Sequence, residues 1–169
     1  MTTVYIGIGS NIGDKVANCQ RAIELIGEKM VIRKVSSLYE TKPWGYSEQD
    51  DFVNSVIEAT TSLGTGELLP LIQTIERDVG RDGVATRRWG PRVIDLDILF
   101  YGMMVLDENR LIIPHPHIAQ RAFVLVPLAE IAPALLHPRL NKTPLEMLSE
   151  LGDKSGVQRL DMSFAVGLQ

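Results

Sequence analysis

The sequence predicts an α+β fold in which strands and helices alternate in the order β-α-β-β-α-β. Two observations support it: four segments are rich in β-branched and aromatic residues, and two segments among them repeat apolar residues at helical spacing. Clusters of Gly, Pro, Ser and Asp separate these segments. With 169 residues, 45% of them hydrophobic, the chain can bury a sizeable core, so we expect one domain over residues 1–169.

The first strand and the first helix are predicted near the N-terminus. TVYIGIGSN is a β-rich run that ends in glycines, and the helical segment GDKVANCQRAIELIGEKM follows it. We expect Gly7, Gly9 and Gly13 to serve a tight turn and the helix start, with Asn11 or Asp14 as the N-cap. The apolar stripe of the helix consists of Val16, Cys19, Ile23 and Ile26.

Two more strands and a second helix follow. VIRKVSSLYET and FVNSVIEAT are β-rich runs separated by the turn-forming segment KPWGYSEQDD. The segment TGELLPLIQTIERDVG predicts a helix that stops at Gly80, with Pro70 near its first turn. Its apolar face carries Leu68, Leu71, Ile72, Ile75 and Val79.

The fourth strand, VIDLDILFY, follows the loop at residues 81–92 and carries two acids. Because side chains alternate along a strand, Asp95 and Asp97 point to the same face, with Cα atoms roughly 6.5 Å apart. Two like charges on a half-buried sheet are unfavourable unless cations or hydrogen-bond donors compensate them. The apolar residues of this strand are expected on the other face: Ile94, Leu96, Ile98 and Phe100.

These elements complete the order of a ferredoxin-like sheet with its helices on one face, which would place the two acids on an inner strand. Beyond this core, MMVLDENRLII predicts a hairpin that turns at residues 107–109. TPLEMLSEL predicts a helix with a capping box formed by Thr143 and Glu146 and with Pro144 at its first position. We therefore expect an α+β fold with a ferredoxin-like core and an added C-terminal hairpin and helices.

Composition limits the partners and the compartment. A net charge of −4 and a pI near 5.4 argue against a general nucleic-acid binder. Cys19 is the only cysteine, so no intramolecular disulfide can form, and its helical stripe favours core packing over a nucleophilic role. The N-terminal residues lack the pattern of a signal peptide, and no apolar run is long enough to span a membrane. We therefore expect a cytoplasmic protein.

Two common nucleotide-binding motifs are absent from the sequence. GIGSNIGD has Ile12 where a dinucleotide fingerprint needs its third glycine, and no P-loop pattern occurs. The loop RDGVATRRWGPR instead concentrates positive charge against a single acid, Asp82, through Arg81, Arg87, Arg88 and Arg92. Arginine presents a planar fork of donors that suits phosphate oxygens.

The basic loop has two interpretations. By itself it is a solvated surface loop, or Arg88 and Arg92 balance Asp95 and Asp97 in a structural network. Its position directly before the two acids favours another interpretation, in which carboxylates bind Mg²⁺ and guanidinium groups bind phosphates at one edge of the sheet. Zinc is poorly supported because the histidines at 115 and 117 lack a thiolate or a third well-spaced histidine.

Aromatic and amide side chains indicate a site for a flat ring. Such a ring could stack on Phe52 or Phe123 while the amide of Asn54 contacts its polar edge, although each residue also fits ordinary packing or a turn. The segment RLIIPHPHIAQRAF supplies further cations for phosphate contacts, at Arg110, His115 and Arg121.

Together these segments resemble the 6-hydroxymethyl-7,8-dihydropterin pyrophosphokinase family of folate biosynthesis. RWGPRVIDLDIL is similar to the family signature, and GSN, ETKPWG, DFVN, IERDVGR, RLIIPHPHI and RAF…PLAEIAP occur in the family's order over nearly the whole chain. The resemblance implies a ferredoxin-like core and an enzyme that transfers pyrophosphate from ATP to a pterin alcohol and releases AMP. It also implies ATP as co-substrate and two Mg²⁺ ions.

The resemblance further implies roles for individual residues. The catalytic set would be Asp95 and Asp97, which hold both Mg²⁺ ions, with Arg92 and His115 on phosphate oxygens. The ATP site would include Arg81, Arg88, Trp89, Ile98, Arg110 and Arg121, with Ile98 beside the adenine. The pterin site would include Thr41, Lys42, Trp44, Phe52, Asn54 and Phe123, with the two phenylalanines on either side of the ring. Glu76 is a further candidate for a substrate contact.

We expect a monomer that binds ATP and a pterin alcohol but neither nucleic acid nor membrane, with other folate enzymes as candidate partners. Two other functions fit part of the pattern. Paired acids on such a sheet also serve two-metal nucleotidyltransferases and cyclases, which release pyrophosphate instead of AMP. A non-catalytic small-molecule module would leave the arginines and acids unexplained, and acidity disfavours an RNA-binding module.

Overall fold

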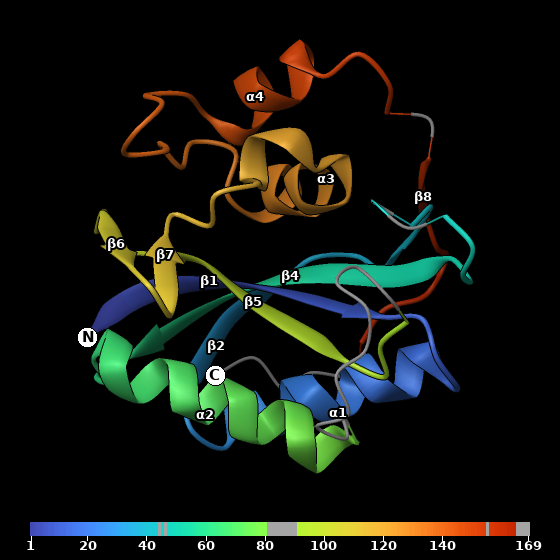
Figure 1. The fold of residues 1–169 in the computed structure, drawn as a ribbon, viewed down its shortest axis with the longest axis horizontal. Coiled ribbons are helices and arrows are strands. Elements are labelled where there is room, and N and C mark those ends of the chain that lie inside the picture. Colours follow the sequence, from blue (N-terminus) through green and yellow to red (C-terminus); the bar gives the residue numbers. More distant parts are fainter. Residues whose placement is uncertain (44, 46, 81–90, 155, 165–169) are drawn as a thin grey trace.

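The computed structural model describes residues 1–43, 45, 47–80, 91–154 and 156–164. They form three layers, with a β-sheet between two layers of helices (Figure 1). Helices α1 (Lys15–Gly27) and α2 (Thr65–Val79) cover one face, and α3 (Ala122–Ile131) and α4 (Pro144–Glu150) cover the other. No helix in this described part is long and apolar enough to cross a membrane.

The main sheet has six strands, and every strand pair in it is antiparallel. Its order is β5-β1-β4-β3-β8, and β2 also pairs with β4. These strands are β1 (Thr2–Ser10), β2 (Val31–Val35), β3 (Tyr39–Thr41), β4 (Phe52–Thr61), β5 (Asp95–Tyr101) and β8 (Val157–Arg159). A separate hairpin pairs β6 (Leu106–Glu108) with β7 (Leu111–Ile113), and the 3₁₀ helix Ile118–Gln120 leads into α3.

The predicted α+β fold is confirmed in its coarse form, since helices pack on an antiparallel sheet, but several of its details are wrong. The sheet order makes β5 an edge strand and not an inner one. The predicted second strand is two strands, β2 and β3, which pair with different parts of β4. The hairpin turns at residues 109–110, because Asp107 pairs with Ile112 inside it. The two core helices, α1 and α2, cover one face as expected, but α3, for which no helix was predicted, covers the other.

Helix boundaries follow the expected capping chemistry. Asp14 is the N-cap of α1, where its carboxylate accepts from the Ala17 N–H at 3.0 Å. Gly80 ends α2 with a left-handed φ of 116°, which favours glycine. The predicted capping box of Thr143 and Glu146 starts α4. Caps of this kind are encoded within three or four neighbouring residues, and sequence reasoning therefore finds them readily.

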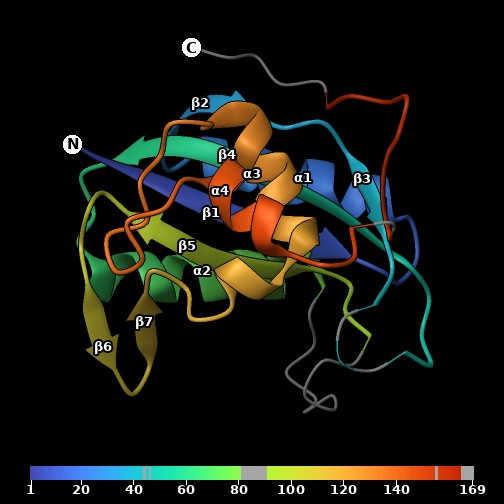
Figure 2. The same ribbon diagram turned by 90° about the horizontal axis from the view of Figure 1, so that it is seen from above.

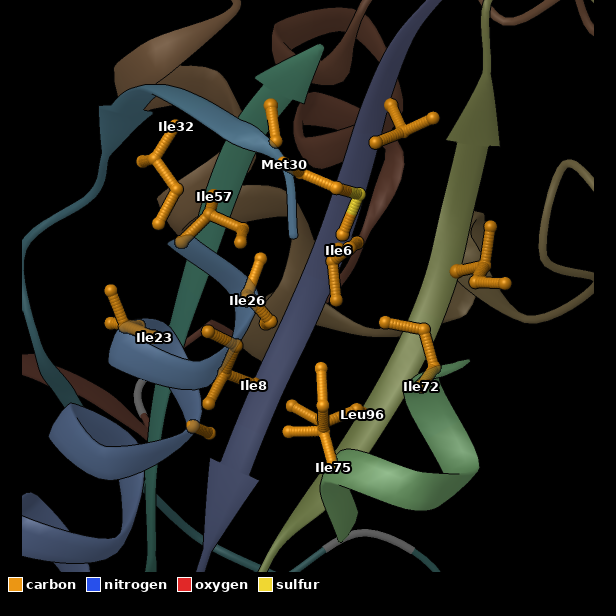
Figure 3. Close-up of a cluster of buried hydrophobic side chains, with 14 of the residues drawn as sticks. Ile6, Ile8, Ile23, Ile26, Met30, Ile32, Ile57, Ile72, Ile75 and Leu96 are labelled. Atoms are coloured by element: carbon orange, nitrogen blue, oxygen red, sulfur yellow. The ribbon is translucent and has the colours of Figure 1, made fainter. Parts of the chain in front are cut away.

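The main apolar core lies between the sheet and the α1–α2 layer. Figure 3 shows how the sheet residues Ile6, Ile8, Ile57 and Leu96 meet helical residues there. Those helical residues are Ile23, Ile26, Ile72 and Ile75. Cys19 is fully buried in the same cluster, and burial raises the pKa of its thiol to about 12. The prediction that Cys19 is a core residue is confirmed.

A second core lies between the other face of the sheet and the α3–α4 layer, which Figure 2 shows lying across the middle of the sheet. It contains Tyr5, Leu99 and Phe100 from the sheet, with Leu125 and Leu128 from α3. The β1–β5 register shifts between Tyr5 and the next residue, so both Leu99 and Phe100 join this core. The predicted placement of Phe100 opposite the two acids is therefore wrong.

His137 organises the loop between α3 and α4. Its ring packs edge-on against Phe100 with ring centroids 5.6 Å apart. The backbone N–H groups of Arg139 and Leu140 both donate to its Nδ1 at 3.2 Å. Burial, followed by the nearby charge of Arg139, lowers the pKa of His137. The neutral ring is thus the form that fits the folded loop.

We expect the protein to lose stability through His137 as the pH falls below about 6.5, the pKa of an unperturbed histidine. The unfolded chain binds that proton first, because the folded-state pKa is the lower one. His137→Asn keeps an acceptor near Nδ1 but cannot titrate. Urea titrations at a series of pH values should show the free-energy gap between wild type and variant narrowing toward low pH. A gap that stays constant would contradict the role of His137.

Candidate active site

A cavity of about 250 Å³ opens between the sheet and the N-terminal end of α3. Its walls come from segments far apart in the sequence: β1, β3, β4, β5, the segment around residue 115, and α3. Its polar and charged lining residues are Thr41, Lys42, Asn54, Ser55, Arg92, Asp95, Asp97, His115 and Arg121. Its other lining residues include Gly7, Gly9, Phe52, Val56 and Phe123.

Two glycines of β1 form the floor of this cavity. In the register of the sheet, Gly7 lies opposite Asp97 and Gly9 lies opposite Asp95. A Cβ atom at Gly9 would lie 2.6 Å from Oδ1 of Asn54, closer than atoms can approach. Both glycines lie inside the strand, so their predicted role in a tight turn is wrong; only Gly13, with φ 70°, adopts a turn conformation.

Within the described residues, the start of α3 supplies a cation to the paired acids. Arg121, the N-cap residue of α3, is only 4% exposed, and its Nη1 donates to Oδ2 of Asp97 at 3.4 Å. Burial lowers the pKa of Arg121, while the charges of Asp97 and Asp95 act in the opposite direction. The guanidinium also lies 5.6 Å from the ring centroid of Phe123. Arg121 thus links the acid pair to an aromatic wall of the cavity.

His115 faces Asp97 from the neighbouring segment, with its Nε2 3.8 Å from Oδ1 of that acid. The backbone N–H of His117 donates to Nδ1 of His115 at 3.2 Å, so the ring proton of the neutral form lies on Nε2. Burial, then the charges of Arg121 and His117, lowers the pKa of His115 to about 3. His115 therefore presents a neutral N–H donor beside the acids.

Two buried polar side chains hold the strand that carries the acids. Glu76 of α2 is 6% exposed, and its carboxylate accepts from the backbone N–H of Leu96, between the two acids, at 2.9 Å. Asn11 is 2% exposed, and its Oδ1 accepts from the backbone N–H of Arg92 at 2.7 Å. The Asn11 N–H donates in turn to the Arg92 carbonyl at 3.0 Å. Glu76 thus holds the backbone of β5 itself, and Asn11 holds the chain three residues before it, while the side chains of Asp95 and Asp97 line the cavity.

The opposite end of the cavity suits a flat, polar-edged ring. Phe52 of β4 and Phe123 of α3 both line it. Asn54 donates from Nδ2 to Oγ1 of the buried Thr41 at 2.6 Å, which fixes the orientation of its amide. Lys42 lies at the rim and pairs with Asp51, with Nζ 2.8 Å from the carboxylate. This end therefore combines aromatic surface with an oriented amide.

A second cavity of about 300 Å³ adjoins the first, and Asp97 and His115 line both. Its remaining walls come from Leu69 of α2, from β5 and from the β6–β7 hairpin. They include Ile98, Arg110, Leu111 and Ile112. Two adjoining cavities that share an acid and a histidine would let two substrates meet at these groups.

The donor set of the first cavity fits magnesium. Asp95 and Asp97 offer two carboxylates on one face of β5. Mg²⁺ in proteins is typically held by one or two carboxylates together with substrate phosphates. Among the described residues, no group of three or more His, Cys, Asp and Glu side chains could hold a metal ion, so a site built from protein ligands alone has no support there.

Apart from the further candidate Glu76, the predicted site residues that the structure describes all line one of the two cavities. The first holds the predicted pterin residues and catalytic residues, and the second holds Ile98 and Arg110. Their individual roles stay predictions. Trp44, Arg81, Arg87, Arg88 and Trp89 lie outside the described residues. Glu76 lines neither cavity and instead contacts the β5 backbone.

Sequence reasoning missed the glycine floor and the two groups that hold β5. Gly7 and Gly9 are two residues apart in a β-rich run, so they share one face of the strand. This spacing could have predicted a face without side chains. Asn11 was considered only as a helix cap. Its contacts with Arg92, across 81 residues, had no local signal.

Comparison with known proteins identifies relatives. A model of the family 7,8-dihydro-6-hydroxymethylpterin-pyrophosphokinase (HPPK) matches residues 5–133. The 2-amino-4-hydroxy-6-hydroxymethyldihydropteridine pyrophosphokinase of Methylorubrum extorquens is 45% identical over 163 residues, which cover 95% of this chain and 100% of that protein. The protein of the same name from Aquifex aeolicus is 43% identical over 150 residues, covering 89% and 92%.

A solved structure of Plasmodium falciparum HPPK-DHPS resembles the fold, with a TM-score of 0.75 and 16% identity. The match covers 94% of this chain but only 48% of that one, so this chain spans about half the length of the solved protein. At this level of identity the likeness concerns the fold alone.

We expect Gly9→Ala to disturb the cavity floor far more than Gly7→Ala. The added methyl at position 9 would displace Asn54 and break its bond to Thr41, whereas at position 7 it would meet Leu99 at an ordinary 3.5 Å. Overpacking of this kind costs roughly 1–3 kcal/mol, and the control should change stability by less than about 1 kcal/mol. Denaturant unfolding of both variants measures this. Equal effects would show that the close approach at Gly9 does not constrain the floor.

Proposed function

The chain belongs to the 7,8-dihydro-6-hydroxymethylpterin-pyrophosphokinase family, and we propose that it transfers pyrophosphate from ATP to 6-hydroxymethyl-7,8-dihydropterin at the two adjoining cavities. One observation supports this location of the reaction above all: Asp97 and His115 line both cavities. The phosphates of ATP, entering from the second cavity, would meet the alcohol of the ring substrate there. The reaction is one step of folate synthesis.

The reaction forms a bond between the hydroxymethyl oxygen of the pterin and the β-phosphorus of ATP. The bond from that phosphorus to the oxygen bridging it to the α-phosphorus breaks, and AMP leaves. Phosphoryl transfer of this kind passes through a loose transition state, so catalysis depends on in-line positioning and on charge stabilisation. No strong base is required, because the hydroxyl proton can pass to solvent as AMP leaves.

Asp95 and Asp97 would hold the two Mg²⁺ ions of the reaction. These ions, when bound with ATP, supply charge neutralisation at the phosphates and lower the pKa of the attacking hydroxyl. The carboxylates contribute from one face of β5, and Glu76 keeps their strand in position through the Leu96 N–H. Binding of the two ions would therefore depend on the backbone position of β5 as well as on the carboxylates.

Three cationic or donor groups would act on the transferred phosphates. Arg92 lies three residues before the acids, with its backbone held by Asn11. His115 offers its Nε2–H as a neutral donor, and Arg121 contributes a buried charge. Arg121 contacts Asp97 directly, so ATP with its ions would share or replace that contact. Groups fixed before substrate arrives need little reorganisation during the reaction.

The ring of the pterin would lie between Phe52 and Phe123 above the glycine floor. A flat ring gains contact area from two aromatic walls, and side chains on the floor would prevent its entry. The amide of Asn54, oriented by Thr41, would form hydrogen bonds with the polar edge of the ring. A site built for such bonds rejects rings that lack them.

The remaining assignments belong to the same proposal. We class the core as ferredoxin-like because β5, β1, β4 and β2 form an antiparallel sheet in the order typical of that fold. We also propose that the protein binds ATP and Mg²⁺, is a monomer and lies in the cytoplasm, as expected from its sequence and from the family reaction. The Plasmodium falciparum protein is an HPPK-DHPS, which supports a role beside other folate enzymes.

The direct test is to incubate the purified protein with ATP, magnesium and 6-hydroxymethyl-7,8-dihydropterin and to identify the nucleotide formed. We expect AMP, and only when pterin and magnesium are both present. Chelation of magnesium should stop the reaction. The two carboxylates are themselves negative, so the phosphate charge is not neutralised without the ions. Formation of ADP, of pyrophosphate, or of no nucleotide product would overturn the proposal.

Asp97→Asn should reduce turnover by roughly 100-fold or more, since it removes a carboxylate at the point where the two cavities meet. The amide has the same shape, so circular dichroism should be unchanged. Asp107→Asn is a matched control because Asp107 is 70% exposed and lies on β6, outside both cavities. Full activity of Asp97→Asn would show that this carboxylate has no role in the mechanism.

A further inference from the structure

The C-terminal strand β8 lies beyond the residues that match the family model, which end at 133. It nevertheless completes the sheet beside β3, with Tyr39 opposite Arg159 and Thr41 opposite Val157. The contact extends past the strand at both ends. The Lys42 N–H donates to the Gly156 carbonyl at 3.0 Å, and the Leu160 N–H donates to the Leu38 carbonyl at 2.8 Å.

The strand that β8 covers is short and carries part of the cavity wall. β3 has three residues, and without β8 its outer edge would have no strand beside it. Short edge segments with exposed backbone hydrogen bonds open most easily. Thr41 of β3 orients the amide of Asn54, and Lys42 follows it at the cavity rim. The position of β3 therefore sets the position of both groups.

β8 also contacts α3, the helix whose N-terminal turn lines the same cavity. Glu130 of α3 accepts hydrogen bonds from Oη of Tyr39 at 2.7 Å and from Oγ of Ser37 at 2.9 Å. Burial raises the pKa of Glu130, but these bonds and the charge of Arg159 outweigh it and lower the value overall. The network ties β3 and β8 to the helix that carries Phe123.

We propose that the segment Gly156–Leu160 is a positioning element of the ring-binding end of the cavity, which fixes Thr41, Lys42 and through them Asn54, and so sets the affinity for the pterin ring. The inference rests on the proposed function. It assigns no catalytic contact to the segment itself. Its role is to restrict β3, because a displaced Asn54 amide would lose hydrogen bonds to the bound ring, each worth about fivefold in affinity.

The sheet order predicts that the effect is selective. β8 lies at one edge of the sheet and β5, with the acids and the second cavity beside it, lies at the other. A change in β8 should therefore weaken binding of the ring substrate and leave binding of ATP unaffected. A general loss of stability would instead disturb both substrates together.

Gly156 and Gly152 provide a matched pair of variants. A Cβ atom at Gly156 would lie 3.3 Å from Cγ of Lys42, whereas a Cβ atom at Gly152 would meet nothing within 4 Å. We expect Gly156→Val to raise the KM for 6-hydroxymethyl-7,8-dihydropterin by at least about fivefold, the equivalent of one net hydrogen bond. The KM for ATP and kcat should stay within about twofold, as should all three constants of Gly152→Val.

Leu160 provides an independent pair. Leu160→Pro removes the N–H that donates to Leu38, whereas Leu160→Ala keeps it and loses only the packing of the side chain. We expect the rise in pterin KM in the proline variant alone. The fluorescence of the oxidised analogue 6-hydroxymethylpterin reports its dissociation constant for each variant without turnover. This dissociation constant should rise in Gly156→Val and Leu160→Pro and stay unchanged in their controls.

The outcomes separate this inference from the proposed function. If the wild type forms no pterin-dependent AMP, the proposed function fails. If the wild type is active and both Gly156→Val and Leu160→Pro keep the wild-type pterin KM, only the positioning role fails. A parallel rise in the KM values for pterin and ATP would also overturn it, because that pattern reports a general loss of structure.

Discussion

The antiparallel register between β1 and β5 determines the position of the central groups of the site. It sets Gly7 opposite Asp97 and Gly9 opposite Asp95, on the face that α3 partly covers. Because side chains alternate, Ile6, Ile8 and Leu96 then face the main core. A slip by one residue would bury the acids among isoleucines and expose the core. The hydrophobic pattern that stabilises the fold therefore also fixes the acids in the cavity.

Charge compensation links the two layers of the protein. Two carboxylates on one strand face need positive charge, and the described structure supplies Arg121 from the start of α3, 24 residues after Asp97. The same helix brings Phe123 and, at its other end, Glu130, which is bonded to Ser37 and Tyr39. One helix thus places a cation and an aromatic wall over the glycine floor.

Local features were predictable from the sequence, and pairings across the chain were not. The caps at Asp14 and Thr143 and the alternation of Asp95 with Leu96 depend on near neighbours. The edge position of β5, the division of β2 from β3 and the pairing of β8 depend on distant partners. Helix α3 has apolar residues all round, with no amphipathic stripe to reveal it, because it packs between the sheet and α4. Residue type and spacing singled out the two acids, the arginines and the aromatic pair, and the resemblance added their roles, but neither predicted how they are arranged in space.

The cavity exists because the second layer cannot pack against this part of the sheet. α3 and α4 bury Tyr5, Leu99 and Phe100, where the sheet offers large apolar side chains. Toward Gly7 and Gly9 the same face offers glycines and acids, and burying it would desolvate charge for little apolar contact. Stability must then come from the opposite face, where isoleucines of α1 and α2 meet the sheet (Figure 3). Because that face is closed mainly by apolar packing, with the buried Glu76 bonded to the backbone of Leu96, the site face can keep polar groups and an open floor without loss of the fold.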